Sequence, residues 1–451
     1  MNNKCSANIY KYCRIYQGDG LGEKVLIQTY GCTLNQADSR IMGSMLSENG
    51  FDIVYNDGKP ASMEGYDYVI VNTCTVKRPT EQKILYRLGK IRGMGKKLIV
   101  AGCMASANRD KIEKVVPEAS IITTSNIGNV VEAIDKIKKG QRAVYDTYGR
   151  VDKLAYGING QGIIARVPIS EGCLSNCSFC ETKYARGPLN SFSEELILQA
   201  VKTSVENGAK EIELTAQDTG AYGLDRKTNI ALLAQHAAQI EGDFRIRVGM
   251  LNPEHLHRYF DDLVDAYKSE KLYKFIHLPV QSGSNTILKK MRRNYTIEEY
   301  ENYVRELRSK ISGISIATDI IVGFPTETDA DFHDTIALLE RIRPEVTNVS
   351  MFGARPHAEA SRMPQLSNTI IKKRSVSASR TARKIQYELH NELLQKVESV
   401  LITEENARSL TGRDDSYRSV AIGKESGVRL GDRIRVRIEG ATSACLIGKM
   451  P

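Results

Sequence analysis

Tryptophan is absent from this sequence, and aromatic residues make up only 7% of its 451 residues. No apolar run approaches the roughly 18 residues of a membrane span, and the N-terminal residues lack the apolar core of a secretory signal. We therefore expect a cytoplasmic protein without a membrane partner, which excludes a secreted scaffold. Internal repeats and low-complexity tracts are also missing. The 41% hydrophobic and 26% charged residues are typical of globular domains.

Cysteine is the residue type that needs an explanation. A cytoplasmic protein does not use its cysteines as a disulfide framework, so metal binding, redox chemistry or burial must account for them. One group is tightly spaced, in the pattern Cys173-x3-Cys177-x2-Cys180. The other cysteines stand alone in the sequence: Cys5, Cys13, Cys32, Cys74, Cys103 and Cys445.

Residues 24–136 predict an N-terminal α/β domain with a parallel sheet. Three short apolar runs are each followed by a cysteine and then by a helical pattern: 25–30, 66–72 and 98–101. Strands that alternate with helices form parallel sheets, and ligands bind where the carboxyl ends of such strands meet. We therefore expect Cys32, Cys74 and Cys103 to converge at one edge. One such cysteine would be interpreted as a small buried residue, but three at equivalent positions indicate a site.

A second series of strands and helices follows a loose stretch at 136–161, which we interpret as a linker. The predicted strands are 163–169, 211–215, 244–249, 274–280, 315–322 and 346–352. Helical patterns separate them at 194–207, 229–240, 297–310 and 329–342. Six parallel strands with intervening helices predict a partial (β/α)6 barrel over 159–385, with its chemistry at the carboxyl ends of the strands.

The last part of the chain, 386–450, predicts a small β-barrel. A basic helical segment at 370–396 leads into short strands at 400–404, 418–422, 432–439 and 445–449. Arg433, Arg435 and Arg437 alternate with apolar residues, so a strand would place the three arginines on one face. Such a face is either solvated or in contact with RNA phosphates. The basic helix together with Lys289, Lys290, Arg292 and Arg293 favours RNA, and the net charge of +9 agrees with it. The predicted fold class is α/β with three units.

Three thiolates as closely spaced as Cys173, Cys177 and Cys180 can hold three irons of a cubane [4Fe-4S] cluster and leave the fourth iron open. A structural zinc site needs four ligands, and the nearest histidine in the sequence is His236. The spacing therefore favours an iron–sulfur cluster over zinc.

This pattern, with Phe179 before its last cysteine, resembles the radical S-adenosylmethionine (SAM) superfamily. The segments QTYGCTLNQADS, NTCTV and AGC resemble the N-terminal signature of the methylthiotransferases. That family's radical SAM segments are similar to LTAQDTGAYG, HLPVQSGSNTILKKMRRNYT and TDIIVGFPTET, and its RNA-binding TRAM module is similar to TGRDDSYRSV and GDRIRVRI. ARGPLNS and ARPHAEASRMPQ resemble the archaeal and eukaryotic branch, which acts on threonylcarbamoyladenosine in tRNA. The resemblance covers residues 24–450.

The resemblance implies a tRNA methylthiotransferase that adds a methylthio group to C2 of N6-threonylcarbamoyladenosine at position 37. It implies two [4Fe-4S] clusters and SAM as cofactors. The tight cysteine group would hold the cluster that cleaves SAM to a 5′-deoxyadenosyl radical, and the three strand-end cysteines would hold a cluster that carries or donates sulfur. The implied partners are the tRNA anticodon stem-loop, an electron donor protein and a sulfur donor. Alternatives are the same chemistry on isopentenyladenosine in tRNA or on a ribosomal-protein aspartate, and a non-catalytic, metal-stabilised RNA-binding protein.

Five further residues follow predicted strands and are candidates for binding SAM: Gln217, Gln281, Ser282, Ser284 and Gly323. Loops between strands and helices favour the same residue types for turns and helix caps, so both interpretations stay open. Capping of the helix after Cys32 accounts for Asp38 or Ser39, and the alternative for Asn35, Asp38 and Ser39 is a supporting role beside the strand-end cysteines. Pro356-His357-Ala358 departs from the Pro-Gly-Thr of the family, although a lone loop histidine is usually a solvated surface residue.

Overall fold

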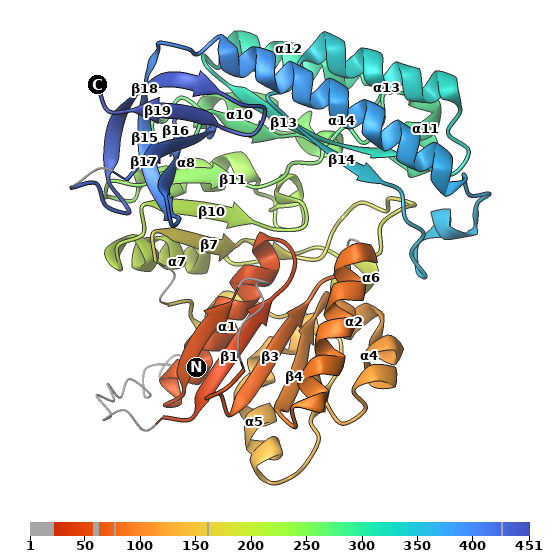
Figure 1. Cartoon of the computed structure of the whole chain (residues 1–451), viewed down its shortest axis with the longest axis vertical. Helices are drawn as coiled ribbons and strands as arrows, with labels where there is room; N and C mark the ends of the chain where they lie inside the picture. The colour runs from red at the N-terminus through yellow and green to blue at the C-terminus, as the bar shows by residue number, and fades with distance from the viewer. Residues whose placement is uncertain (1–21, 57–62, 76–77, 160–161, 425–426) are drawn as a thin grey trace, which may run out of the picture.

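The computed structural model describes residues 22–56, 63–75, 78–159, 162–424 and 427–451. Cys5 and Cys13, to which the sequence assigns no role, lie outside these ranges. The chain forms an N-terminal parallel sheet, a middle unit with two further parallel sheets, and a closed C-terminal barrel (Figure 1). Among the helices so described, none is long and apolar enough to cross a membrane.

The N-terminal unit contains a six-stranded parallel sheet in the order β2-β1-β3-β4-β5-β6. Its strands are β1 (Lys24–Thr29), β2 (Asp52–Asn56), β3 (Tyr68–Thr73), β4 (Lys97–Gly102), β5 (Ser120–Ile122) and β6 (Val144–Tyr145). Its helices are α1 (Thr33–Glu48), α2 (Arg78–Gly93), α3 (Cys103–Ala107), α4 (Arg109–Val115) and α5 (Val130–Lys138), with the 3-10 turn η1 (Thr124–Asn129). β1, β3 and β4 are apolar and almost wholly buried, as central parallel strands should be. Their adjacency brings their carboxyl ends together.

The middle unit contains six parallel strands in two three-stranded sheets, β11-β10-β7 and β12-β13-β14. The strands are β7 (Ile164–Pro168), β10 (Glu211–Thr215), β11 (Arg245–Val248), β12 (Phe275–His277), β13 (Ser315–Val322) and β14 (Val346–Met351). Isolated parallel bridges, Ile246 to Leu272 and Met250 to His277, connect the two sheets. The predicted partial barrel is therefore confirmed, with a break in regular pairing between β11 and β12.

Helices alternate with these strands. They are α7 (Glu194–Glu206), α8 (Ile230–Gln239), α9 (Pro253–Leu256), α10 (Phe260–Ala266), α11 (Asn285–Met291), α12 (Ile297–Lys310) and α13 (Asp329–Ile342). Shorter elements are η2 (Lys153–Tyr156), β8 (Ser170–Glu171), α6 (Thr182–Arg186), β9 (Asn190–Ser191), η3 (Thr219–Ala221) and η4 (Glu359–Arg362). The stretch predicted as a linker contains two regular elements, β6 and η2. β6 pairs with β5 and so extends the N-terminal sheet. The residue boundaries of the three units stay predictions.

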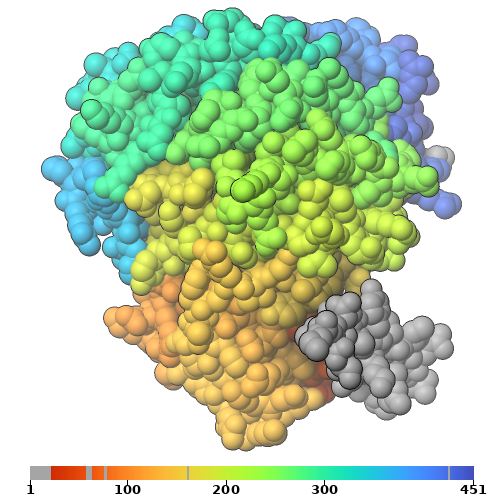
Figure 2. Space-filling model, turned by 180° about the vertical axis from the view of Figure 1, so that it is seen from behind, coloured from red at the N-terminus to blue at the C-terminus, as the bar shows by residue number. Residues whose placement is uncertain are grey.

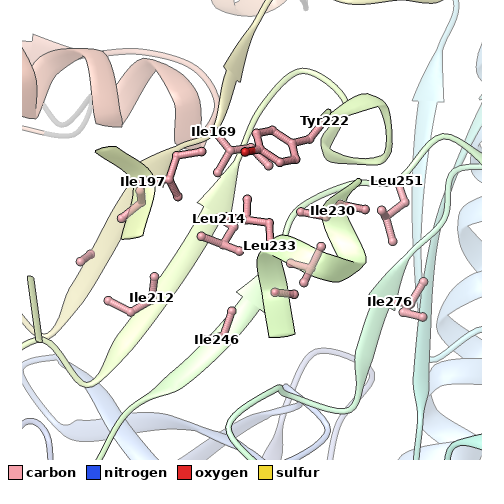
Figure 3. Packing of buried hydrophobic residues seen from close by; sticks show 14 of the residues in the cluster. Ile169, Ile197, Ile212, Leu214, Tyr222, Ile230, Leu233, Ile246, Leu251 and Ile276 are labelled. Atoms are coloured by element: carbon pink, nitrogen blue, oxygen red, sulfur yellow. The ribbon is translucent and has the colours of Figure 1, made fainter. Parts of the chain in front are cut away.

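One hydrophobic cluster runs through both the N-terminal and the middle unit. It includes Val25 of β1 as well as Ile212 and Leu214 of β10. In Figure 3, Ile197 of α7 and Leu233 of α8 pack against the strands of the middle unit. Seen from behind, the N-terminal unit lies directly against the middle unit over a continuous surface (Figure 2). The two units therefore share a core.

The C-terminal unit is a closed barrel in the order β15-β16-β17-β19-β18. Its strands are β15 (Val397–Glu405), β16 (Ser409–Asp414), β17 (Ser419–Gly423), β18 (Arg433–Ala441) and β19 (Leu446–Lys449). The long helix α14 (Asn368–Asn391) packs on β14 and reaches β18. The predicted α/β fold with a small terminal β-barrel is thus confirmed, although β16 was not predicted.

Candidate functional site

The three strand-end cysteines lie together at the carboxyl edge of the N-terminal sheet. Cys32 precedes α1, Cys74 follows β3, and Cys103 is the first residue of α3 directly after β4. The thiols of Cys32 and Cys103 lie 3.3 Å and 3.8 Å from the same Oδ1 atom of Asn35. Cys74 and Cys103 are buried, whereas Cys32 is exposed. The site is therefore open on the Cys32 side.

Two glycines allow this close approach. Gly31 has a φ of 123°, and a Cβ there would lie 3.0 Å from the Cβ of Cys74. Gly102 has a φ of 89°, and a Cβ there would lie 2.2 Å from Oδ1 of Asn72 and 2.6 Å from the carbonyl of Thr73. Positive φ disfavours a side chain at both positions, and at Gly102 the space beside the backbone of Thr73 is also missing.

Polar side chains behind the cysteines hold the loops in place. Asn35 donates to Oδ1 of Asn72 at 3.2 Å and to the carbonyl of Thr73 at 2.8 Å. Asn72 donates back to the carbonyl of Asn35 and to the hydroxyl of Ser39. Asp38 binds Lys153 and Arg186 instead of backbone N–H groups. The expected capping by Asp38 and Ser39 is therefore wrong, because both side chains turn into a buried network.

The second cysteine group occupies the loop between β8 and α6. Cys173, Cys177 and Cys180 are all partly exposed there. Sγ of Cys180 accepts a hydrogen bond from the N–H of Thr182 at 3.3 Å, and Sγ of Cys177 accepts one from Nη1 of Arg293 at 3.4 Å. N–H donors aimed at sulfur stabilise thiolates.

Burial controls the protonation of these thiols. It raises the pKa of Cys103 to about 12, against the opposing effect of the Arg186 guanidinium. Burial also raises the pKa of Cys173 and of Cys177, and Arg293 opposes the shift at Cys177. Free thiols in such surroundings are protonated and unreactive, whereas a bound metal deprotonates a coordinating thiol outright.

The donor chemistry of both groups fits an iron–sulfur cluster better than a single ion. Within the described ranges, no three His, Cys, Asp or Glu side chains are spaced to hold one metal ion. A cubane cluster binds each thiolate through a different iron, which suits three converging cysteines that do not surround one point. Glycines before Cys32, Cys103 and Cys173 have positive φ and leave room beside the sulfur ligands.

The segments that follow the two cysteine groups contact each other across an interface between the units. Helix α6, which begins two residues after Cys180, packs on α3, which begins with Cys103. Nε of Arg186 in α6 donates to Sγ of Cys103 at 3.1 Å. Glu181, directly after Cys180, accepts from the hydroxyl of Thr75 at 2.7 Å. Sequence neighbours of both groups therefore bind each other.

Gln217 lies after β10 with both side-chain amide atoms buried and without a hydrogen-bond partner among the described residues. Buried amides are rarely left in this state, and the binding of SAM by Gln217 stays a prediction. Ser284 instead caps α11 and donates to Asp331 at 2.6 Å.

The other candidates for SAM binding have contacts of their own. The hydroxyl of Ser282 accepts from the N–H of Ser284. Gln281 has a positive φ of 71° and forms a bridge with Ile320. Gly323 has a φ of 76°, and its N–H donates to Glu327 at 2.7 Å. Turn and cap roles account for these three contacts, and their binding of SAM stays a prediction.

A buried network beside the second cysteine group was not predicted. Ser175, within the cysteine loop, donates to Glu254 at 2.9 Å and accepts from Asn252 at 2.8 Å. His255 lies 3.5 Å from Asp218, whose pKa is raised by burial. The sequence signal that could have identified these residues is the NPEH segment after β11, where polar residues follow a barrel strand.

His357 is exposed but not isolated. Its ring stacks on Tyr184 of α6 with 3.7 Å between the ring centroids, and its Nε2 lies 2.9 Å from the carbonyl of Ala107 in α3. The departure Pro356-His357-Ala358 therefore connects the loop after β14 to both helices of the interface. His357 lies at the surface as expected, but it also contacts α6 and α3.

The arginines of β18 do not have equal surroundings. Arg435 and Arg437 are exposed on the outer face, and Val436 and Ile438, which alternate with them, are buried in the barrel. Arg433 is partly covered and lies 3.5 Å from both Asp243 and Asp415. The alternation predicted from the sequence is confirmed, and two of the three guanidinium groups are available to a partner.

The model of the radical SAM superfamily matches residues 167–339, and a model described as uncharacterized protein family UPF0004 matches residues 24–124. A "Probable threonylcarbamoyladenosine tRNA methylthiotransferase" of Pyrococcus abyssi is 41% identical over 434 residues, which cover 95% of this chain and 99% of that protein. Proteins of Drosophila melanogaster and Homo sapiens with the name "Threonylcarbamoyladenosine tRNA methylthiotransferase" are 32% and 31% identical. The matches cover 95% and 89% of this chain, and 78% and 70% of those proteins.

Solved structures agree with the fold. A radical S-adenosylmethionine methyltransferase from Kitasatospora setae, with tryptophan and a SAM analogue bound, superimposes with a TM-score of 0.56 at 14% identity. The superposition covers 75% of each chain. At this level of identity the likeness concerns the fold alone.

Proposed function

The chain belongs to the family of threonylcarbamoyladenosine tRNA methylthiotransferases, and we propose that it adds a methylthio group to C2 of N6-threonylcarbamoyladenosine at position 37 of tRNA. One observation carries the proposal. Two groups of three cysteines, from two differently folded units, lie on either side of the contact between α3 and α6. A reaction that needs both a radical and a sulfur source benefits from two redox centres held next to one substrate site.

In this proposal Cys173, Cys177 and Cys180 hold the [4Fe-4S] cluster that binds SAM, and Cys32, Cys74 and Cys103 hold a second cluster. When bound, these groups supply the adenosyl radical chemistry and the sulfur. The protein's part is to place them. The glycine turns fix the cysteines, and Gln217, at the carboxyl end of β10, offers an unpartnered amide for SAM. Because Cys32 is exposed, the group of Cys32, Cys74 and Cys103 is accessible from outside.

The partners follow from the same proposal. The tRNA anticodon stem-loop would contact Arg435 and Arg437 of β18, whose guanidinium groups are exposed on one face. An electron donor protein and a sulfur donor are required because no side chain here can supply an electron or an inorganic sulfur atom to repeated turnovers. We propose a cytoplasmic location, where tRNA is modified.

Mass spectrometry of tRNA nucleosides tests the proposal. Cells that lack the gene should lose 2-methylthio-N6-threonylcarbamoyladenosine, and the wild-type chain should restore it. Cys177→Ala and Cys103→Ala should each fail to restore it, whereas Cys445→Ala, a matched change far from both groups, should succeed. An unchanged nucleoside profile in the deletion strain would reject the tRNA assignment.

Assays of the purified, anaerobically reconstituted protein distinguish the roles of the two cysteine groups. Cys177→Ala should form no 5′-deoxyadenosine from SAM. Cys103→Ala should still form it but yield no methylthiolated nucleoside. Methylthiolation of isopentenyladenosine in tRNA, or of a ribosomal-protein aspartate, by the purified protein would assign the same chemistry to one of these alternative substrates. Zinc without iron in anaerobically purified protein would favour the non-catalytic RNA-binding alternative.

A further inference from the structure

Arg186 is among the most deeply buried charged residues of the chain, with only 1% of its surface exposed. It ends α6, six residues after Cys180, and yet its guanidinium contacts the other cysteine group. Nε donates to Sγ of Cys103 at 3.1 Å. A buried arginine is costly unless its donors are satisfied, so the positions of its partners define its function.

Two carboxylates fix the orientation of this guanidinium. Nη1 of Arg186 donates to Glu171 at 2.8 Å, and Nη2 donates to Asp38 at 2.9 Å. Lys153 binds the second oxygen of each carboxylate, at 2.7 Å and 2.8 Å. Two positive and two negative charges thus neutralise one another, and the planar fork leaves Nε–H aimed at the sulfur. A lysine, with a single nitrogen, cannot satisfy both carboxylates and the sulfur in this way.

We propose that Arg186 is a positioning residue that raises the reduction potential of the iron–sulfur cluster held by Cys32, Cys74 and Cys103. The inference rests on the proposed function, which assigns a cluster to these cysteines. Hydrogen bonds to the sulfurs and nearby charge set the potential of such clusters. An N–H donor on a sulfur ligand stabilises the reduced cluster, because reduction adds negative charge to that sulfur.

The chain offers its own comparison in Arg293. The sequence counts this residue among the cations that favour RNA, but it is buried, at 8% exposure, and donates to Sγ of Cys177 in the other group. Its remaining donors bind the hydroxyl of Tyr295 and the carbonyl of Pro279. Each cysteine group therefore has one buried arginine on one sulfur, and a change at either should affect its own cluster alone.

The experiment measures the potential of one cluster at a time in the full chain. Replacing Cys173, Cys177 and Cys180 by alanine leaves the N-terminal group as the site to be loaded by anaerobic reconstitution. A redox titration followed by electron paramagnetic resonance then gives the midpoint potential. Arg186→Lys should lower it, with about a tenfold smaller ratio of reduced to oxidised cluster at a fixed potential. That ratio corresponds to about 59 mV for a one-electron couple.

Removing a buried charge can also prevent folding, so a second variant preserves the charge balance. Arg186→Gln combined with Asp38→Asn removes one positive and one negative charge together and should lower the potential similarly. Arg293→Lys in the same background should leave it unchanged. Comparable iron content and thermal unfolding would exclude a general loss of structure.

The outcomes separate the inference from the proposal on which it rests. A cluster that forms in both Arg186 variants with the wild-type potential would overturn the inference and leave the proposed function intact. A chain with wild-type Arg186 that binds no cluster at the N-terminal cysteines would overturn both. A lowered potential in Arg293→Lys as well would assign the effect to burial in general and so contradict a role specific to Arg186.

Discussion

At the residue scale, Gly102 sets the path of the backbone between β4 and Cys103. It combines a φ of 89° with a position where a Cβ would lie 2.2 Å from Oδ1 of Asn72 and 2.6 Å from the carbonyl of Thr73. The clash with the carbonyl of Thr73 involves a backbone atom, which cannot move away by a change of rotamer as a side-chain atom can. We predict that Gly102→Ala abolishes iron binding at the N-terminal cysteine group. Iron content after anaerobic reconstitution measures this.

Gly140 is the matched control for that substitution. Its φ of 73° is also positive, but nothing lies within 4 Å of the position that a Cβ would take. Gly140→Ala therefore introduces backbone strain of about 1–2 kcal/mol without a clash and should retain full iron content. Equal iron binding by both variants would contradict the close-approach argument.

The sequence predicts the roles of some residues of the proposed site but not of others. The tight group of Cys173, Cys177 and Cys180 is identified by spacing alone, and the strand-end cysteines are identified because parallel strands share an edge. Arg186 and Lys153 gave no such signal. Arg186 binds Asp38, a residue 148 positions away in the chain, and no local pattern reports a contact that only the packing of two units creates.

At the element scale, the predicted bounds of a helix or strand match the structure best where its own sequence contains a strong helix or strand signal. The predicted bounds of α12 and α13 match the structure, because both helices are amphipathic and begin with a capping box, formed by Thr296 with Glu299 and by Thr328 with Asp331. β5 and β6 are only three and two residues long. Strands this short depend on pairing with a neighbour more than on their own sequence, so they were missed.

The loop after β14 is held to α6 and α3 by His357, and this contact can be measured. His357 stacks on Tyr184 with 3.7 Å between centroids and an interplanar angle of 6°. We predict that His357→Ala and Tyr184→Ala each destabilise the chain, and that the double variant loses less than the sum. The coupling should be about 0.5–1.5 kcal/mol. Chemical denaturation of the four proteins gives this value.

His357→Gln is the informative control, because an amide can still donate to the carbonyl of Ala107 but cannot stack. It should recover part of the stability lost in His357→Ala and show little coupling to Tyr184. Full additivity in the original pair of variants would mean that the rings are neighbours without a stabilising contact.

At the scale of the whole molecule, the shared core joins the two units that contain the cysteine groups, whereas the β-barrel has a smaller hydrophobic cluster of its own and contacts the middle unit through Tyr417. The hydrophobic cluster of the N-terminal and middle units is continuous, whereas the barrel has its own cluster around Val400, Val436 and Leu446. The net charge of +9 is an overall value, and it cannot identify which cations face a polyanion. The surroundings of single arginines on β18 make that distinction.

Arg435 and Arg437 are exposed, whereas Arg433 lies between Asp243 and Asp415, 3.5 Å from each. A cation that is already neutralised releases few counterions on binding RNA. We predict that Arg435→Ala and Arg437→Ala each reduce the slope of log K against log salt by about 0.7–1, and that Arg433→Ala reduces it much less. Binding of tRNA at several salt concentrations gives the slopes. Equal slopes for all four proteins would remove β18 from the RNA interface, and an equal reduction in the three variants would mean that tRNA displaces the two aspartates.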